Sequence, residues 1–535
     1  MLEPGKTYDQ LVGDFKWQIP DHFNIADAVC TRWATETPDN TAIIEEMQDG
    51  PVRRTSFAEL EAMANRFANL LIKSGISRGD RVALLLPQCR ETAAAHVATY
   101  KIGAVAVPLA MLFGVEALQY RLQNSGARAL IMSTASQENV SEVLPGLEAI
   151  QKVFCIDGVL PFAPHIHDAS GKLNTRCETA DTSPDDPALM IYTSGTTGHP
   201  KGALHGHRVL PGHIPGVQFA HEFFPQPDDL MWTPSDWAWA GGLLNALLPS
   251  LYFGTPVLAF SYAKFDPAQA WELIAQHKVR NVFMPPTALK LMRASTPQDV
   301  SKLSLRTIFS GGEAVGTALQ EWAIEKLSMK INEVYGQTEC NLVLESCNAI
   351  GVWKSGAIGK PVPGHTVAIV DDEGNALPDG ETGNIAVQRP DPVMFLEYWG
   401  KPEATKEKYR GDWLITGDQG FCDDEGYFHF VGRDDDVITS SGYRIGPVEI
   451  EDCLSRHPAV QLAAVVGIPD PVRTEIVKAF IVLNKGFSAG ADLEADIQQH
   501  VRNRLSAHEY PRIIEFRDEL PLTTTGKVIR RLLRG

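Results

Sequence analysis

A run of hydroxyl-bearing residues and glycines that leads to a lysine is the segment of this sequence best suited to bind an anion. It covers residues 192–202 and reads Tyr-Thr-Ser-Gly-Thr-Thr-Gly-His-Pro-Lys-Gly. Glycines let backbone N–H groups approach an anion, hydroxyl groups donate further hydrogen bonds, and Lys201 adds a positive charge. The segment is not a Walker A motif, because it lacks Gly-Lys-Ser/Thr. Its composition predicts a phosphate-binding loop, with a flexible surface loop as the alternative.

Six further short motifs follow between residue 310 and the C-terminus. They read Ser310-Gly311-Gly312-Glu313-Ala314, Tyr335-Gly336-Gln337-Thr338-Glu339, Thr416-Gly417-Asp418, Gly432-Arg433-Asp434-Asp435-Asp436, Gly442-Tyr443-Arg444-Ile445-Gly446-Pro447 and Thr525-Gly526-Lys527. With the loop, and in the same order, they resemble the motifs of the adenylate-forming superfamily, which contains acyl-CoA synthetases, peptide-synthetase adenylation domains and firefly-type luciferases. The resemblance extends from residue 192 to residue 530. Two positions depart mildly from the family pattern: Leu522 replaces a basic residue and Thr525 replaces a serine.

The resemblance implies a binding site for ATP and AMP. Tyr335 is similar to the aromatic residue that packs on adenine, Thr338 to the residue that donates to the α-phosphate, and Asp418 to the residue that accepts hydrogen bonds from ribose. Residue type alone would also allow a core aromatic at Tyr335 and a turn aspartate at Asp418. The nucleotide-binding residues that the resemblance implies are Thr193, Ser194, Gly195, Thr196, Thr197, Gly198, Lys201, Gly312, Glu313, Ala314, Glu333, Tyr335, Gly336, Gln337, Thr338, Asp418, Arg433 and Lys527.

Lys527, Thr338 and Glu339 are the catalytic residues that the resemblance implies. Lys527 is expected to bridge the attacking carboxylate and the α-phosphate as negative charge develops. Glu339 is expected to bind Mg²⁺, a hard cation that prefers oxygen ligands and bridges phosphates. The plain alternatives are a solvated glutamate and one more lysine in a basic tail. Related bacterial synthetases are switched off by acetylation of this lysine, so a lysine acetyltransferase or deacylase acting on Lys527 is a candidate partner.

The resemblance further implies two reactions at one site. A carboxylic acid attacks ATP to form an acyl-adenylate, and the thiol of coenzyme A then displaces AMP. In the family a small C-terminal domain rotates between the two steps about a residue that corresponds to Asp435. The residues expected to contact coenzyme A are Ser441, Gly442, Tyr443, Arg444 and Arg473, with a surface ion pair as the alternative for Arg444 and for Arg473.

The acyl group is expected to bind beside a tryptophan-rich segment at residues 231–239. Its Ser235-Asp236-x-x-Trp239 pattern is similar to the branch of acetyl-, propionyl- and medium-chain acyl-CoA synthetases, in which the tryptophan lines the acyl pocket. A core aromatic is the alternative for Trp239. Apolar walls discriminate poorly between neighbouring chain lengths, so short, medium-chain, branched, thioether-containing and aromatic acids stay open. The other expected wall residues are Leu112, Met284, Pro285, Gly311, Gly336 and Cys340.

Three other functions fit the same scaffold. An adenylation enzyme that loads a carrier protein would usually be joined to a carrier domain, and this chain ends at Gly535. A luciferase-type oxygenase is a second alternative, and a non-catalytic adenylate sensor is a third. An aromatic acid-CoA ligase remains open within the acyl-CoA synthetases.

Composition excludes several other classes of protein. The net charge of −18 argues against a nucleic-acid partner but not against small anions. The eight cysteines are scattered and form no Cys-x-x-Cys pair, so reduced cysteines in the cytoplasm are expected. The longest apolar run, Ile102–Val115, is too short to span a membrane, and no secretory signal opens the chain. The oligomeric state stays open, with a homo-oligomer as one possibility.

Alternating helical and strand-like patterns in the first half predict a largely parallel sheet with helices on both faces. Ser56 and Glu59 form a capping box before a helix that ends at Gly75. Strands are expected at Arg81–Leu86, Ile102–Leu109, Ala129–Met132, Val153–Ile156, Ala188–Tyr192, Val279–Phe283 and Thr307–Phe309.

Shorter strands with turn signals around Gly359–Val387 predict a small β-rich subdomain. From Asp435 onward, two helices (Pro447–Ser455 and Leu493–Leu505) and strands near Leu462–Val466 and Ile476–Leu483 predict a small α+β domain. We therefore predict an α/β protein with a large N-terminal AMP-binding (adenylation) domain, residues 1–434, of layered, mostly parallel sheets with helices and the β-rich subdomain. A mobile C-terminal domain, residues 435–535, follows a hinge at Asp435.

Overall fold

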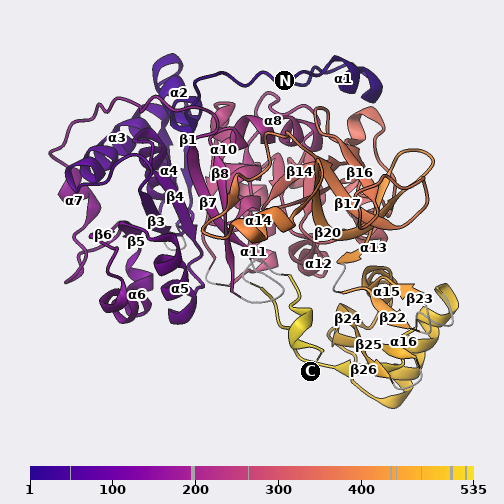
Figure 1. The fold of residues 1–535 in the computed structure, drawn as a ribbon. Helices are drawn as coiled ribbons and strands as arrows, with labels where there is room; N and C mark the ends of the chain where they lie inside the picture. Colours follow the sequence, from indigo (N-terminus) through magenta and orange to yellow (C-terminus); the bar gives the residue numbers. More distant parts are fainter. Residues whose placement is uncertain are drawn as a thin grey trace.

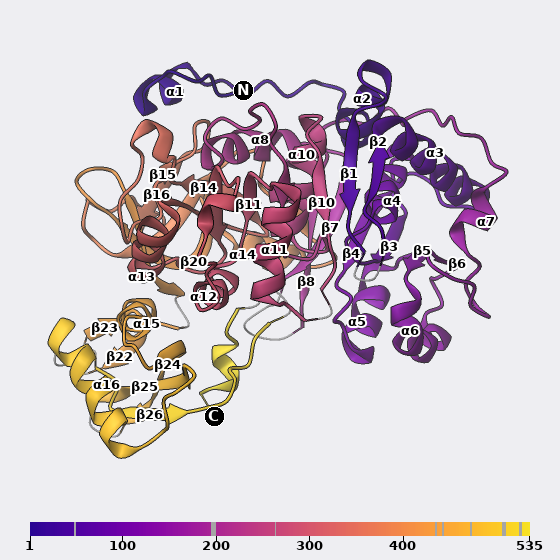
Figure 2. The ribbon, with the colours of Figure 1, turned by 180° about the vertical axis from the view of Figure 1, so that it is seen from behind.

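The computed structural model describes residues 1–47, 50–193, 199–262, 264–433, 436–440, 443–470, 473–505, 510–523 and 527–534. Two bodies are visible in Figures 1 and 2, the main body (residues 1–433) and a smaller C-terminal body (residues 436–534). The predicted boundary and hinge at Asp435 lie outside the described residues. None of the helices in the described ranges has both the length and the apolar content that crossing a bilayer requires.

The first large sheet has seven strands in the order β18-β8-β7-β4-β3-β5-β6. The strands β7, β4, β3, β5 and β6 run parallel, whereas β8 and β18 close one edge antiparallel. Their bounds are β3 Arg81–Leu85, β4 Val105–Leu109, β5 Ala129–Met132, β6 Lys152–Cys155, β7 Pro187–Thr193, β8 Lys201–Gly206 and β18 Glu397–Tyr398. The predicted strands are confirmed, except that β4 begins at Val105 instead of Ile102. Helix α4 (Arg90–Lys101) extends to this point, and Gly103, at φ +68°, turns the chain into the strand.

The second large sheet has nine strands in the order β15-β14-β13-β12-β11-β9-β10-β1-β2. Six neighbouring strands, from β1 to β13, are parallel, and antiparallel strands close both edges. Their bounds are β1 Thr41–Glu45, β2 Arg53–Ser56, β9 Met231–Trp232, β10 Val257–Ala259, β11 Asn281–Phe283, β12 Thr307–Gly311, β13 Ile331–Gln337, β14 Cys340–Glu345 and β15 Lys360–Pro361.

Helices cover both faces of the seven-stranded sheet, as predicted. Side chains on a strand alternate between faces, and on β3 Val82 and Leu84 join the core under α3 and α4, whereas Ala83 and Leu85 join the core under α5 and α6. The capping box of Ser56 and Glu59 begins α3. The helices of the main body are α1 Tyr8–Asp14, α2 Arg32–Glu36, α3 Phe57–Lys73, α4, α5 Val115–Ser125, α6 Gln137–Val143, α7 Ile166–Ser170, α8 Val209–Ala220, α9 Ala240–Gly242, α10 Leu248–Tyr252, α11 Pro267–His277, α12 Pro286–Arg293, α13 Thr317–Trp322 and α14 Pro402–Glu407.

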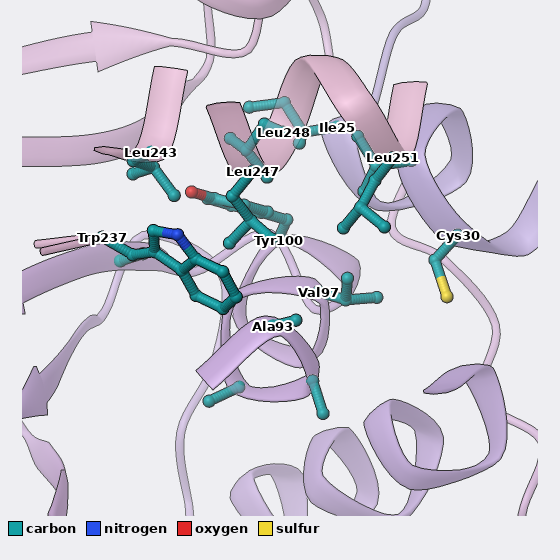
Figure 3. Packing of buried hydrophobic residues seen from close by; sticks show 14 of the residues in the cluster. Ile25, Cys30, Ala93, Val97, Tyr100, Trp237, Leu243, Leu247, Leu248 and Leu251 are labelled. Atoms are coloured by element: carbon teal, nitrogen blue, oxygen red, sulfur yellow. The ribbon is translucent and has the colours of Figure 1, made fainter. Parts of the chain in front are cut away.

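The two large sheets share one central core. It contains residues of α4, α8, α10 and the segment η4 (Leu243–Leu247), together with strand residues from both sheets. Figure 3 shows part of it, where Trp237 lies near Tyr100 of α4 and Leu247 of η4. The outer face of the nine-stranded sheet packs against α11, α12 and α13. The strand ends of both sheets are thereby held rigidly.

The predicted β-rich subdomain is an antiparallel sheet in the order β16-β17-β20-β19, with β21 paired to β20. It extends further along the chain than predicted, to Arg433. The bounds are β16 Val367–Val370, β17 Gly383–Gln388, β19 Tyr409–Arg410, β20 Trp413–Cys422 and β21 Phe428–Arg433.

The C-terminal body has its own sheet and its own apolar core. Helix α15 (Pro447–Ser455) has the predicted bounds, and α16 (Ala491–Arg504) lies within two residues of its predicted bounds. The strands are β22 Ile438–Ser440, β23 Tyr443–Ile445, β24 Val460–Asp470, β25 Thr474–Leu483 and β26 Ile513–Phe516. From this body the C-terminal tail, yellow in Figures 1 and 2, runs back toward the main body.

Candidate active site

The ends of the anion-binding loop are held by two paired strands. Thr193 ends β7 and lies opposite Lys201, which begins β8. The hydroxyl of Tyr120 donates to the carbonyl of Pro200 at 2.9 Å, and its ring stacks on His199 at 4.7 Å between centroids. Residues Ser194, Gly195, Thr196, Thr197 and Gly198 lie outside the described residues. The predicted phosphate loop therefore joins β7 and β8, two antiparallel neighbours near one edge of the seven-stranded sheet.

The predicted adenine and ribose residues come together between the nine-stranded sheet and the β-rich subdomain. Tyr335 lies at the end of β13, and its hydroxyl donates to Oδ2 of Asp418 on β20 at 2.7 Å. Arg433 on β21 lies opposite Asp418, with its Nε 4.0 Å from Oδ1. Burial raises the pKa of Asp418, and the hydrogen bond from Tyr335 and the charge of Arg433 oppose this rise. Residues far apart in the chain thus form one polar group.

Gln337, another residue of the same motif on β13, is held by hydrogen bonds that could not be predicted from the sequence. Its amide donates to the carbonyl of Thr416 at 3.0 Å, and its carbonyl oxygen accepts from Lys408 at 3.1 Å. Lys408 also donates to the carbonyls of Ile415 and Thr416. Lys408 belongs to none of the motifs. Its role could not be predicted because its partners lie in two segments that are separated in the sequence. It ties β13 to the β-rich subdomain.

Lys527 reaches this site from the C-terminal body. A Cβ atom placed on Gly312 would lie 3.2 Å from Lys527 Cε and 3.4 Å from Nζ, so the ammonium group borders the backbone at the end of β12. Desolvation lowers the pKa of Lys527, and the carboxylates of Glu313 and Asp418 oppose this shift. The residue nevertheless keeps an exposed face. Glu313 is fixed by Thr287, whose hydroxyl donates to it at 2.8 Å.

Thr338 and Glu339 form the turn between β13 and β14. Glu339 is buried, its backbone carbonyl accepts from the N–H of Phe395 at 2.8 Å, and its carboxylate accepts from the hydroxyl of Tyr398. Burial raises the pKa of Tyr398. Sequence reasoning missed Tyr398, which lies 59 residues from Glu339 in the chain.

Glu333 lies beneath the turn at Gly312–Ala314. It is buried on β13, and its Oε1 accepts from the N–H of Val315 at 3.1 Å. Burial raises the pKa of Glu333 to about 8, so the folded protein favours the neutral acid at neutral pH. In this position the side chain supports the turn from below.

Glu333→Gln is expected to flatten the dependence of stability on pH. A carboxyl group whose pKa rises on folding gives its full contribution to stability below its unfolded pKa, and this contribution is lost as pH rises toward the folded pKa of about 8. The variant should match the wild type in Tm at pH 5 and exceed it by several degrees at pH 8.5. Calorimetric melts across this range measure the effect, with exposed Glu325→Gln as the control. An unchanged pH profile would contradict the assignment.

The predicted acyl-pocket residues have unequal environments. Met284 and Cys340 are buried. A Cβ on Gly311 would lie 2.3 Å from the carbonyl of Val334, and a Cβ on Gly336 would lie 2.5 Å from the N–H nitrogen of Leu342, so no side chain fits at either glycine. Leu112 does not form the expected buried wall.

Leu112 is 68% exposed, and the neighbouring Phe113 is the residue that turns inward. The ring of Phe113 meets the half-buried ring of Trp239 edge to face, with centroids 5.7 Å apart. Trp237, two residues earlier, is 1% exposed and belongs to the central core (Figure 3). Of these two tryptophans, Trp239 is therefore the more exposed one.

Of the predicted coenzyme A residues, the structure describes Arg473 and the backbone of Tyr443 and Arg444. Ser441 and Gly442 lie outside the described residues, as do the side chains of Tyr443 and Arg444, whose backbone forms β23. Arg473 follows β24, and its N–H donates to Asp470. Strand β23 and the tail that carries Lys527 lie at opposite ends of the C-terminal body (Figures 1 and 2).

Asp452 on α15 fastens the C-terminal body to the main body. Its carboxylate accepts from the Thr317 hydroxyl at 2.6 Å and from the Ala318 N–H at 3.1 Å, at the start of α13. The residue before this helix, Gly316, has no side chain with which to cap it. Asp452 therefore caps a helix of the other body.

Asp452→Ala is expected to loosen the docking of the two bodies. Loss of a helix-capping side chain costs about 1 kcal/mol, which should increase the population of undocked molecules. Small-angle X-ray scattering of the unliganded protein should then give a larger radius of gyration than the wild type gives. The control is Asp492→Ala, an exposed residue of α16. Identical scattering from both variants and the wild type would rule out this capping role.

Comparisons with known proteins agree with this geometry. The family model described as "AMP-binding enzyme" matches residues 30–399, and "AMP-binding enzyme C-terminal domain" matches residues 449–527. Acyl-coenzyme A synthetase ACSM3, mitochondrial, of Pongo abelii is 34% identical, over 99% of this chain and 92% of the relative. Acetyl-coenzyme A synthetase of Bacillus subtilis is 34% identical, over 90% and 84%. The crystal structure of the anthranilate CoA ligase AuaEII in complex with anthranoyl-AMP superposes with a TM-score of 0.89 at 29% identity, over 96% of this chain and 97% of that one.

Proposed function

The chain belongs to the AMP-binding enzyme family, and we propose that it is an AMP-forming acyl-CoA synthetase. It converts a carboxylic acid, ATP and coenzyme A into acyl-CoA, AMP and diphosphate through an acyl-adenylate. The observation that carries this proposal is the meeting of Lys527 with the end of β12, beside the group formed by Tyr335, Asp418 and Arg433. Carboxylate activation requires a positive charge where negative charge develops between the carboxylate and the α-phosphate, and the Lys527 ammonium group can supply it.

The first reaction joins the acid to the nucleotide. An oxygen of the acid carboxylate attacks the α-phosphorus of ATP, and the bond to diphosphate breaks. The N–H groups and hydroxyls of the loop between Thr193 and Lys201 hold the phosphates, Tyr335 borders adenine and Asp418 accepts the ribose hydroxyls. Lys527 stabilises the negative charge that builds up between the carboxylate and the α-phosphate, and Thr338 donates to the same phosphate.

Glu339 fits the role of magnesium ligand, because it offers carboxylate oxygens at the edge of the phosphate site. When bound, Mg²⁺ neutralises phosphate charge and favours departure of diphosphate. Glu339 would hold the ion near Lys201, because the carboxylate and the ammonium group both contact Tyr398. The second reaction requires the C-terminal body to turn about Asp435, so that the segment from Ser441 to Arg444, together with Arg473, guides the coenzyme A thiol to the acyl carbonyl and AMP leaves.

The acid is proposed to be a short- to medium-chain or other hydrophobic carboxylic acid. Met284, Cys340 and Trp239 would provide an apolar environment for its tail, and backbone packing leaves no room for a side chain at Gly311 or Gly336. Aromatic acids are the second candidate, because the anthranilate CoA ligase shares the fold over nearly the whole chain.

We also propose that acetylation regulates the enzyme. Acetylation of Lys527 by a lysine acetyltransferase would remove the charge that the first reaction needs, and a deacylase would restore it. A homo-oligomer and a cytoplasmic location stay predictions from the sequence. The ACSM3 relative is named as mitochondrial.

Release of AMP and diphosphate tests the proposed function. Purified protein is incubated with Mg²⁺-ATP and acetate, butyrate, hexanoate, octanoate, benzoate or anthranilate, with and without coenzyme A. We expect steady AMP release with at least one acid, dependent on coenzyme A, and the matching acyl-CoA in mass spectra. Absence of AMP with every acid, or acyl transfer to a carrier protein but not to coenzyme A, would overturn the proposal.

A further inference from the structure

Tyr398 is a buried tyrosine that the reaction scheme above does not use. It is 3% exposed and ends the short strand β18, where it lies opposite Ala203 of β8. Its neighbours continue this pairing: the N–H of Leu396 donates to the carbonyl of Leu204 at 2.6 Å, and the N–H of Trp399 donates to the carbonyl of Gly202 at 2.8 Å. The tyrosine is thus fixed to the strand that leaves the phosphate loop.

The hydroxyl of Tyr398 donates to Oε1 of Glu339. The same short segment also holds the backbone of Glu339, because the N–H of Phe395 donates to its carbonyl at 2.8 Å. Two hydrogen bonds, one to the main chain and one to the carboxylate, therefore restrict the position and the orientation of this side chain.

The ring face of Tyr398 carries a second charged group. Nζ of Lys201 lies 4.9 Å from the ring centroid, within the range of a cation–π interaction. The carboxylate of Glu339 and the ammonium of Lys201 therefore both rest on one buried tyrosine, although they come from different sheets.

We infer that Tyr398 is a positioning residue that sets the Glu339 carboxylate and the Lys201 ammonium at a fixed separation for binding magnesium-bound triphosphate. The inference rests on the proposed function and adds a residue to its site. Tyr398 acts through Glu339 and Lys201 and touches no reacting atom itself. A hydrogen bond to one carboxylate oxygen orients the group and leaves its other lone pairs for a metal ion.

Tyr398→Phe removes the hydroxyl and keeps the ring under Lys201. Loss of a residue that orients a metal ligand lowers metal affinity by about 10–100-fold. Calorimetric titration should show such a loss in affinity for Mg²⁺-ATP, with affinity for ATP in EDTA unchanged. The rate of thioester formation from pre-made acyl-AMP, which needs no triphosphate, should also be unchanged.

Tyr427→Phe is the matched control, because Tyr427 is also buried and its hydroxyl donates to the carbonyl of Gly351 instead of to Glu339. It should bind Mg²⁺-ATP like the wild type. If Tyr398→Phe yields no folded protein, Tyr398→His, which keeps a ring N–H donor, replaces it and should keep the preference for Mg²⁺-ATP over metal-free ATP close to that of the wild type. Loss of that preference in the histidine variant would overturn the inference.

A double-mutant comparison separates positioning from packing. In a Glu339→Gln background, Tyr398→Phe should cause little further loss of Mg²⁺-ATP affinity, because the carboxylate that it orients is absent. An equal loss in both backgrounds, or equal losses of affinity for ATP with and without Mg²⁺, would overturn the inference. Failure of the proposed function looks different, because the wild-type protein itself would then release no AMP.

Discussion

Lys527→Ala is expected to lower the rate of adenylate formation by about 10²–10³-fold, the usual cost of removing a group that stabilises transition-state charge. The structure places the ammonium group against Gly312, with Glu313 and Asp418 close enough to influence its pKa. Lys527 is the single lysine in residues 511–535. The nearby Arg530 and Arg534 are engaged with Glu451 and Asp436. Exchange of labelled diphosphate into ATP measures this reaction alone.

The second reaction should be spared in the same variant. The C-terminal tail, which carries Lys527, and strand β23 lie on opposite sides of the C-terminal body (Figures 1 and 2). We therefore expect an orientation that presents one of them to the site to withdraw the other. Thioester formation from pre-made acyl-AMP should therefore stay within about twofold of the wild type, a change worth well under 1 kcal/mol.

Two further variants complete this experiment. Lys485→Ala changes an exposed lysine of the same body and should leave both reactions intact. Enzyme acetylated at Lys527 should behave like Lys527→Ala, because acetylation removes the charge. A parallel loss of both reactions in Lys527→Ala would show that the lysine does not act in adenylate formation alone.

Local motifs could be read from the sequence because their chemistry is local. The loop at residues 192–202 needs glycines and hydroxyls next to one another, and the helix after Ser56 needs its capping glutamate three residues later. The structure explains why two motif positions are occupied by glycine: at Gly311 and Gly336 a side chain would collide with nearby backbone atoms. The five parallel strands of the first sheet were predictable because they contain continuous apolar runs, whereas the antiparallel strands β8 and β18 do not and were not predicted.

Contacts between distant segments could not be read in this way. Tyr398 and Glu339 are 59 residues apart, Lys408 and Gln337 are 71 apart, and Asp452 and Thr317 are 135 apart. Each pair depends on how strands or bodies pack, and no spacing rule connects the two residues. Leu112 failed as a predicted wall for a related reason. Which residue of a turn points inward depends on the backbone conformation of that turn, here in favour of Phe113.

Trp239→Ala is expected to shift the preference of the enzyme toward longer acids. Removal of the indole opens apolar space beside Phe113, and each methylene that enters it gains about 0.8 kcal/mol. The value of kcat/KM should rise about fourfold per added methylene until the space is filled, and acetate or butyrate should lose activity because they no longer fill the site. The chain-length profile is measured with straight-chain acids from about two to ten carbons, in which each acid is longer than the one before by a single methylene.

The alternative is that Trp239 only stabilises the hydrophobic core and does not contact the acid. The same substitution at Trp237, a core residue, provides the comparison. Trp237 is 1% exposed in the central core, so Trp237→Ala should lower stability by about 3–5 kcal/mol and reduce activity with all acids together. Trp239 is half-buried, and its indole N–H has no hydrogen-bond partner among the described residues, so its truncation removes packing but no hydrogen bond. Trp239→Ala should therefore keep a Tm close to that of the wild type while its chain-length profile moves. If it instead loses activity uniformly and melts as early as Trp237→Ala, Trp239 is a core residue and the acyl pocket must lie elsewhere.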